Sequence, residues 1–162
     1  MSMKWPLAPT MAVVMLAAAT PALSQAAGGA NCEMTATPLA FGRYTPQSGS
    51  PADFTATVTV TCSSQGVDPV AVEGSVALLG DAAGRRLTSG AAELRYQLYL
   101  DPARSRPWGD GTGGGETAPV SGTAGANAPY RQTITLYGRI LARQTLASVG
   151  AYSDQIEAVL TY

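Results

Sequence analysis

One stretch, Phe54 to Cys62, constrains the fold of this chain more than any other. It reads Phe-Thr-Ala-Thr-Val-Thr-Val-Thr-Cys, so that apolar residues alternate strictly with threonine. Successive side chains of an extended chain point to opposite faces, and the pattern therefore predicts a β-strand with one buried face and one solvent-exposed face. Valine and threonine also favour strands. Because the strand ends on one of only two cysteines, we expect its end to be tied to another part of the fold.

A second alternating stretch runs from Tyr152 to Tyr162, where the sequence ends without a polar tail. Its apolar positions are Tyr152, Ile156, Ala158, Leu160 and Tyr162, and Asp154 interrupts the series. The spacing predicts a final amphipathic strand. We expect the next neighbour of this strand to be supplied from elsewhere.

Four more strands are expected between these landmarks, at Cys32–Phe41, Val70–Leu79, Leu94–Leu100 and Thr133–Ile140. Pro38 makes the first of them irregular, which suits an edge strand or one that switches sheets. A short extra strand is expected near Glu116–Val120. Charged residues make up only 13% of the sequence, and glycine and proline are frequent. About six short strands in such a sequence favour an all-β fold, a two-sheet antiparallel sandwich.

The first two dozen residues have the pattern of a secretory signal peptide. Lys4 provides a positive charge, Met11–Ala19 is a short apolar run, and Pro21 ends it before several small residues. We expect residues 1–24 to be the signal, with cleavage after Ser24 or Ala26. A disordered N-terminus or a membrane anchor is the alternative. The run is too short to span a bilayer stably, and no second one follows, so we expect no transmembrane segment.

Residues 25–162 then form a single secreted domain, which contains both cysteines, Cys32 and Cys62. In an oxidising compartment two cysteines suggest one disulfide. Such a bond closes a loop of about 30 residues and contributes roughly 3–4 kcal/mol in the chain-entropy model. Two buried free thiols are the alternative.

The sequence lacks the groups that most catalytic sites require. It contains no histidine, which excludes Ser-His and Cys-His nucleophile pairs and the usual zinc sites. No phosphate-binding or dinucleotide-binding loop is present. The formal net charge is −1 and the basic residues are scattered, so no nucleic-acid footprint appears. We therefore expect no enzyme, no cofactor and no metal site.

The irregular region from 101 to 127 leaves weaker alternatives open. Asp110–Gly113 with Glu116 offers hard oxygen ligands for calcium, but a glycine-rich hairpin loop is favoured. Asp101 and Asp110 are interpreted as turn residues rather than a glycosidase pair. Trp108 is expected to pack over the end of the sandwich rather than to bind sugar. Arg85-Arg86, further upstream, is interpreted as a solvated hairpin end rather than a binding patch.

Six stretches in order, spanning almost all of the chain after the expected signal, resemble one known family. They are Cys32…Pro38–Tyr44, Val58–Ser63, Tyr96–Arg104, Trp108–Gly113, Tyr137–Ile140 and Gly150–Asp154 running into the final strand. Together they resemble the spore coat protein U domain, which is found in secreted pilins of the archaic chaperone–usher pathway.

This resemblance implies an incomplete immunoglobulin-like sandwich of about six strands that lacks its seventh. It further implies that a periplasmic chaperone first supplies the missing strand, and that a neighbouring pilin subunit then replaces it as an outer-membrane usher extends a surface fibre for attachment and biofilm formation. The apolar residues of the final strand, Tyr152, Ile156, Ala158, Leu160 and Tyr162, become candidates for the acceptor groove. The family pairing also places a disulfide between Cys32 and Cys62.

One feature departs from a pilin that both accepts and donates a strand. A donor needs about ten alternating residues before the first cysteine strand, whereas Gln25–Asn31 is short and has no bulky apolar residue. We therefore expect a subunit that accepts a strand but donates poorly, at a fibre tip or in a minor role. The alternative function is a stand-alone secreted β-sandwich that binds a ligand such as a carbohydrate, and a secreted hydrolase is a third, disfavoured by the absence of histidine.

Overall fold

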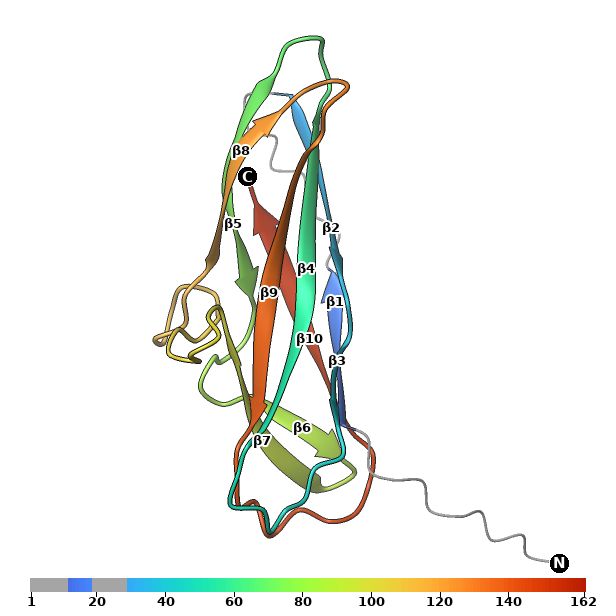
Figure 1. Cartoon of the computed structure of the whole chain (residues 1–162), viewed down its shortest axis with the longest axis vertical. Helices are drawn as coiled ribbons and strands as arrows, with labels where there is room; N and C mark the ends of the chain where they lie inside the picture. The colour runs from blue at the N-terminus through green and yellow to red at the C-terminus, as the bar shows by residue number, and fades with distance from the viewer. Residues whose placement is uncertain (1–11, 19–28) are drawn as a thin grey trace, which may run out of the picture.

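The computed structural model of the protein describes residues 12–18 and 29–162. Its regular structure is entirely β, and no helix that could cross a membrane occurs in these residues. The body is elongated, and β4 and β9 run along most of its length (Figure 1). The strands are β1 (Ala12–Ala18), β2 (Ala30–Ala36), β3 (Leu39–Gly42), β4 (Ala52–Ser64), β5 (Val70–Leu78), β6 (Arg86–Ser89), β7 (Ala92–Tyr99), β8 (Ala118–Ala124), β9 (Tyr130–Ile140) and β10 (Tyr152–Thr161).

The strands form two layers joined at one corner. One layer has the antiparallel order β2-β4-β9-β7. In the other, β10 lies between β1 on one edge and β5 with β6 on the opposite edge, while β8 extends β5 and β3 pairs with β1. The β6–β7 hairpin connects the layers. The predicted all-β sandwich is confirmed; only the β1–β10 pairing is parallel among the strands described.

Strand β4 shows the alternation that its sequence predicts. Ala56, Val58, Val60 and Cys62 are buried in the core, whereas the threonines between them lie partly exposed. Its neighbours cover it on both edges, since β2 pairs with its second half and β9 with nearly all of it. This strand is therefore the centre of its layer and is paired on both edges over its second half.

Several predicted strands have different bounds in the structure. The expected first strand is divided at Pro38 into β2 and β3, because proline has no N–H for a ladder. The short strand expected near Glu116–Val120 begins at Ala118, since Glu116 instead closes a loop by donating its N–H to the Pro107 carbonyl. Strand β6, Arg86–Ser89, was not predicted, because four residues carry too little pattern.

The expectation of a solvated hairpin end at Arg85-Arg86 is wrong for Arg85. Its guanidinium is buried and donates to the carbonyls of Leu78, Leu79 and Trp108, so that it fills the space between the end of β5 and the start of β6. Arg86 is exposed and forms an ion pair with Glu93. A long side chain that bonds to backbone carbonyls leaves no signal in the local sequence.

Trp108 is fully buried, as its packing role predicts. Its indole Nε1 donates to the Val76 carbonyl at 3.0 Å, which anchors the irregular region to β5. Asp101 accepts bonds from the backbone of Ser105 and Arg106. Asp110 likewise accepts from the backbone and hydroxyl of Thr112. Both aspartates thus act as turn residues, as expected.

Candidate functional site

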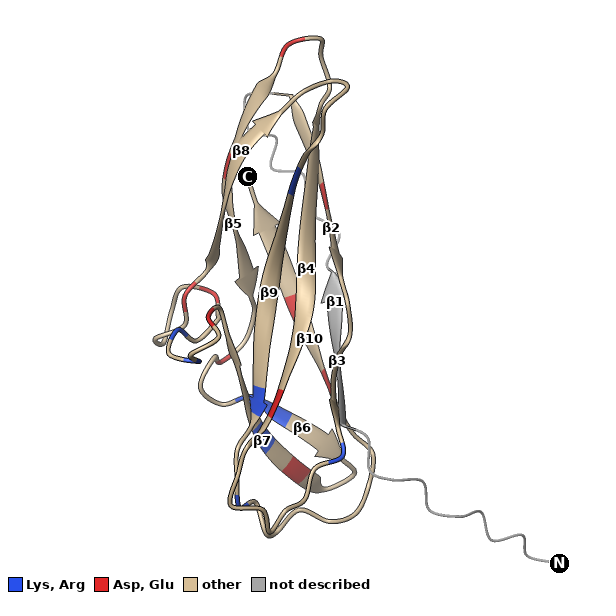
Figure 2. Ribbon diagram, viewed as in Figure 1, with Lys and Arg blue, Asp and Glu red and all other residues tan. Residues whose placement is uncertain are grey.

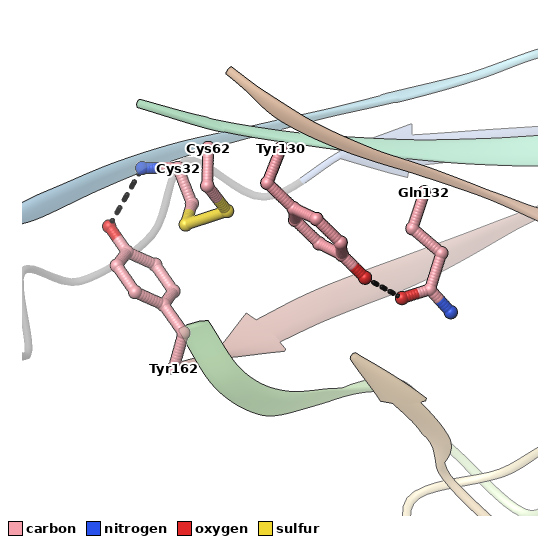
Figure 3. Close-up of a disulfide and its surroundings, with 5 residues drawn as sticks. All are labelled: Cys32, Cys62, Tyr130, Gln132 and Tyr162. Atoms are coloured by element: carbon pink, nitrogen blue, oxygen red, sulfur yellow. Dashed lines mark hydrogen bonds between the residues drawn. A yellow bond between two sulfur atoms is a disulfide. The ribbon is translucent and has the colours of Figure 1, made fainter. Parts of the chain in front are cut away.

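The predicted disulfide is confirmed, with Cys32 and Cys62 joined at 2.07 Å. The two residues face each other across the antiparallel β2–β4 pair (Figure 3). Their Cα atoms lie 4.0 Å apart, as in a pair that exchanges no backbone hydrogen bonds. Further along, Thr37 donates its N–H to the Thr57 carbonyl. Because backbone groups alternate in direction, those of Cys32 point away from β4, to the free edge of β2.

The predicted groove residues lie on one face of β10. The side chains of Tyr152, Ile156, Ala158 and Leu160 are buried in the core, and that of Tyr162 is half-buried at the end of the strand. The sequence places them on one face, and the structure brings them together there.

Asp154, which interrupts the apolar series, has a buried partner that the sequence did not reveal. Its Oδ2 accepts a hydrogen bond of 2.6 Å from the Tyr96 hydroxyl, and its Oδ1 accepts from the Gln155 N–H. Burial, followed by this hydrogen bond, raises the pKa of Tyr96, which keeps the phenol a donor. Burial lowers the pKa of the neighbouring Arg85. Asp154 therefore holds β10 to β7 and is not a free polar group of the groove.

One edge of β10 is closed by the chain itself. Ala158–Thr161 pairs with β5 and Ser153 pairs with β6. Leu79 donates its N–H to the Glu157 carbonyl at 2.9 Å, so the backbone groups of Glu157 point to this edge. By alternation, those of Ile156, Ala158 and Leu160 point to the opposite edge.

The opposite edge of β10 pairs only with β1 among the described residues. Ala12–Ala18 lies parallel to β10, from the Ala12–Tyr152 pair to the Ala18–Ala158 pair. The start of β1 also pairs antiparallel with β3, with a register shift after Ala12. These residues belong to the apolar run that is expected to form part of a signal peptide. The expected cleavage sites, Ser24 and Ala26, lie outside the described residues.

Residues 29–162 taken alone contain an unfilled place in the sheet. Within them, β3 has no pairing partner and β10 has none on its groove-side edge, while β2 is paired only with β4. We call the space between β10 on one side and β2 and β3 on the other the β10 groove. Such an edge presents a row of N–H and C=O groups that another strand can pair with.

The segment expected to be a poor donor is shorter still in the structure. Ala30 and Asn31 belong to β2 and pair with Ser64 and Ser63 of β4. Gln25–Gly28 lies outside the described residues. Part of the segment thus already belongs to the sheet formed by this chain.

The rest of the described surface offers weaker candidates. Charged residues are sparse along the long strands, and several gather where β6 and β7 lie (Figure 2). No cluster of three or more potential metal ligands occurs in the described part of the chain. A hollow of about 540 Å³ lies beside β10, and its lining, which includes Asp81, Arg85 and Glu157, contains no aromatic side chain. The carbohydrate-binding alternative therefore gains no support there.

Comparison with known proteins places these features in one family. No match to the sequence is found among the curated proteins. The family model described as Spore Coat Protein U domain matches residues 17–159, which is most of the chain.

Proposed function

We propose that this chain, which belongs to the Spore Coat Protein U domain family, is a subunit of a chaperone–usher surface pilus assembled by donor-strand complementation. The family is a structural pilin-type domain rather than an enzyme, and its members are secreted to the cell surface. The specific proposal is that the β10 groove receives a strand from another molecule.

The single observation that carries this proposal is the pairing of β10. Residues 29–162 cover one edge of β10, and among the described residues the other edge is completed only by β1, which lies N-terminal to them. If residues 1–24 are a signal peptide that is removed, β1 leaves with them and the edge opens. A partner strand then takes its place.

The energy at stake is large on the scale of a single domain. A strand that inserts four or five apolar side chains contributes roughly 6–15 kcal/mol by burial. That range is comparable to the whole stability of a typical domain, about 5–15 kcal/mol. The secreted subunit is therefore marginal while its groove is empty, and it requires a partner to persist.

We infer the partners from this requirement and from the family. A periplasmic chaperone supplies the first strand, and a neighbouring subunit replaces it at an outer-membrane usher. The assembled fibre serves surface attachment and biofilm formation. Because Gln25–Asn31 is short and partly held in β2, this subunit accepts a strand better than it donates one, which suits a fibre tip or a minor position.

Co-expression tests the proposal directly. The full chain is secreted into the periplasm of a bacterial host with and without a candidate pilus chaperone, and the soluble product is purified. We expect a one-to-one complex with the chaperone, and degraded or aggregated subunit without it. A matched control chaperone carries polar residues in place of the apolar residues of its donor strand. Equal yields of monomeric subunit in all three cultures would contradict the proposal.

A further inference from the structure

Tyr162 reaches from the end of β10 across the groove to β2. Its hydroxyl accepts a hydrogen bond of 3.4 Å from the backbone N–H of Cys32 (Figure 3). The two residues are 130 positions apart in the sequence, and they come from opposite layers of the sandwich. The contact therefore spans the β10 groove at one end.

The N–H that Tyr162 engages is an edge group of β2. The backbone of Cys32 points away from β4, as its unbonded pairing with Cys62 and the Thr37–Thr57 bond establish. A strand added along this edge would use the same N–H. Tyr162 and an added strand thus compete for one donor.

Both ends of the contact are anchored by neighbouring structure. On the β2 side, the disulfide fixes Cys32 to Cys62. On the β10 side, the chain passes closely over Gly74 of β5: a Cβ at that position would lie 2.1 Å from the Thr161 carbonyl oxygen and 2.9 Å from the Tyr162 Cα. Only glycine permits this approach. The ring of Tyr162 also packs against the core.

We propose that Tyr162 is an end stop of the β10 groove, which limits how far a partner strand pairs along β10. This inference rests on the proposed function. Among the described residues, β1 pairs with β10 from Tyr152 to Ala158, along the same edge that the Tyr162 contact crosses further on. A partner strand pairs as far as Leu160 and gains nothing from further residues, because Tyr162 crosses its path and holds the Cys32 N–H. The preferred partner is thus an extended apolar segment of limited length.

A set of nested peptides tests the end stop on the chain as secreted, after removal of the expected signal peptide, because β1 otherwise occupies the β10 groove. The labelled probe is a peptide with the sequence of residues 12–18, alone or followed by Thr, Thr-Val, Thr-Val-Thr or Thr-Val-Thr-Val. A second series carries the same additions at the other end, because a peptide bound in the reverse direction would meet Tyr162 there. The variants are Tyr162→Phe, which removes only the hydroxyl, and Tyr162→Ala. Tyr130→Phe is the matched control, since the nearby Tyr130 hydroxyl bonds to Gln132 instead.

For the unmodified chain, we expect the affinity for the peptide to rise with peptide length in one of the two series. The affinity should level off once the peptide is long enough to pair with Leu160. In Tyr162→Phe and Tyr162→Ala, the longest peptides of that series should bind roughly two- to tenfold tighter, the gain from one net hydrogen bond. Tyr130→Phe should match the unmodified chain. Amide exchange at Cys32, without peptide, should accelerate in Tyr162→Phe and not in Tyr130→Phe.

Identical length dependence in all variants, or an unchanged exchange rate at Cys32 in Tyr162→Phe, would overturn the end stop while leaving the proposed function in place. Failure of every peptide to bind every variant would overturn the proposed function, and the end stop with it.

Discussion

Strands β4 and β10 have almost the same sequence pattern but different surroundings. Both alternate apolar and polar residues, and both bury the apolar face. Within residues 29–162, strand β4 pairs with β9 along most of its length and with β2 over its second half. Within residues 29–162, strand β10 is paired on one edge only, and its other edge pairs with β1. The alternation of apolar and polar residues thus predicts which face of a strand is buried, but it does not predict which strands pair with its edges.

The distinction has a functional consequence. A buried face stabilises a fold, whereas an unfilled edge requires a partner. In this molecule, β10 has both a buried face and, within residues 29–162, an unfilled edge. Changes in β4, which is paired on both edges over its second half, and in β10, whose groove-side edge is open within residues 29–162, should therefore have different effects.

The largest effect is expected from truncating core side chains in the two layers. Leu136→Ala in β9, beside β4, should lower the free energy of unfolding by about 2–5 kcal/mol, with or without a strand in the groove. Ile156→Ala in β10 should cost a similar amount in the full chain, where Leu16 is its paired residue. In residues 25–162 alone it should cost less, because the groove beside it is open. Denaturant unfolding of the full chain and of residues 25–162 measures these free energies. Equal losses for Ile156→Ala in the two forms would contradict an open edge beside β10.

Removing the disulfide should affect both regions, because β2 borders the groove and covers β4. The double variant Cys32→Ser, Cys62→Ser should lose roughly 2–4 kcal/mol of stability, by freeing the loop that the bond closes. Chemical denaturation under non-reducing conditions measures the change. A loss below about 1 kcal/mol would show that the β2–β4 pairing holds without the covalent link.

A smaller effect is expected on the closed edge of β10. Trp108→Phe retains a ring but loses the Nε1 bond to the Val76 carbonyl, which leaves a buried acceptor without its partner. We expect a loss of about 1–3 kcal/mol, measured by thermal unfolding. Arg86→Ala, which removes an exposed ion pair at the neighbouring hairpin, is the control and should change stability by less than about 1 kcal/mol. Equal losses in the two variants would argue against the buried bond.

The smallest effect concerns the pairing of β4 with β9 and is pH-dependent. Asp53 of β4 forms a two-point pair with Arg139 of β9, and this bond lowers the pKa of Asp53. A lowered pKa in the folded state adds stability above the unfolded-state pKa, and that stability is lost as the pH falls through the folded-state value. Asp53→Asn should therefore cost about 0.5–1 kcal/mol at neutral pH, and the difference should shrink below pH ~4. A difference independent of pH would contradict the pairing.

Much of the fold could be predicted from residue patterns, because alternation and proline act locally. The strand at Phe54–Cys62, the break at Pro38 and the final strand all follow from that kind of signal. The burial of Arg85 and the Tyr96 partner of Asp154 depend on distant segments, so no local pattern shows them. The same holds for β1. Its residues have the apolar run of a signal peptide, and nothing in that run indicates pairing with β10.

Amide hydrogen exchange on residues 25–162 tests the central claim most directly. The amides of Ile156 and Ala158 point to the open edge of β10, whereas Val58 lies in β4 between two strands. We expect fast exchange at Ile156 and Ala158 and slow exchange at Val58, with the two β10 amides slowing when an extended apolar peptide or a chaperone is added. Ile156 and Ala158 amides as slow as that of Val58 with nothing added, and unchanged by any strand, would contradict that claim.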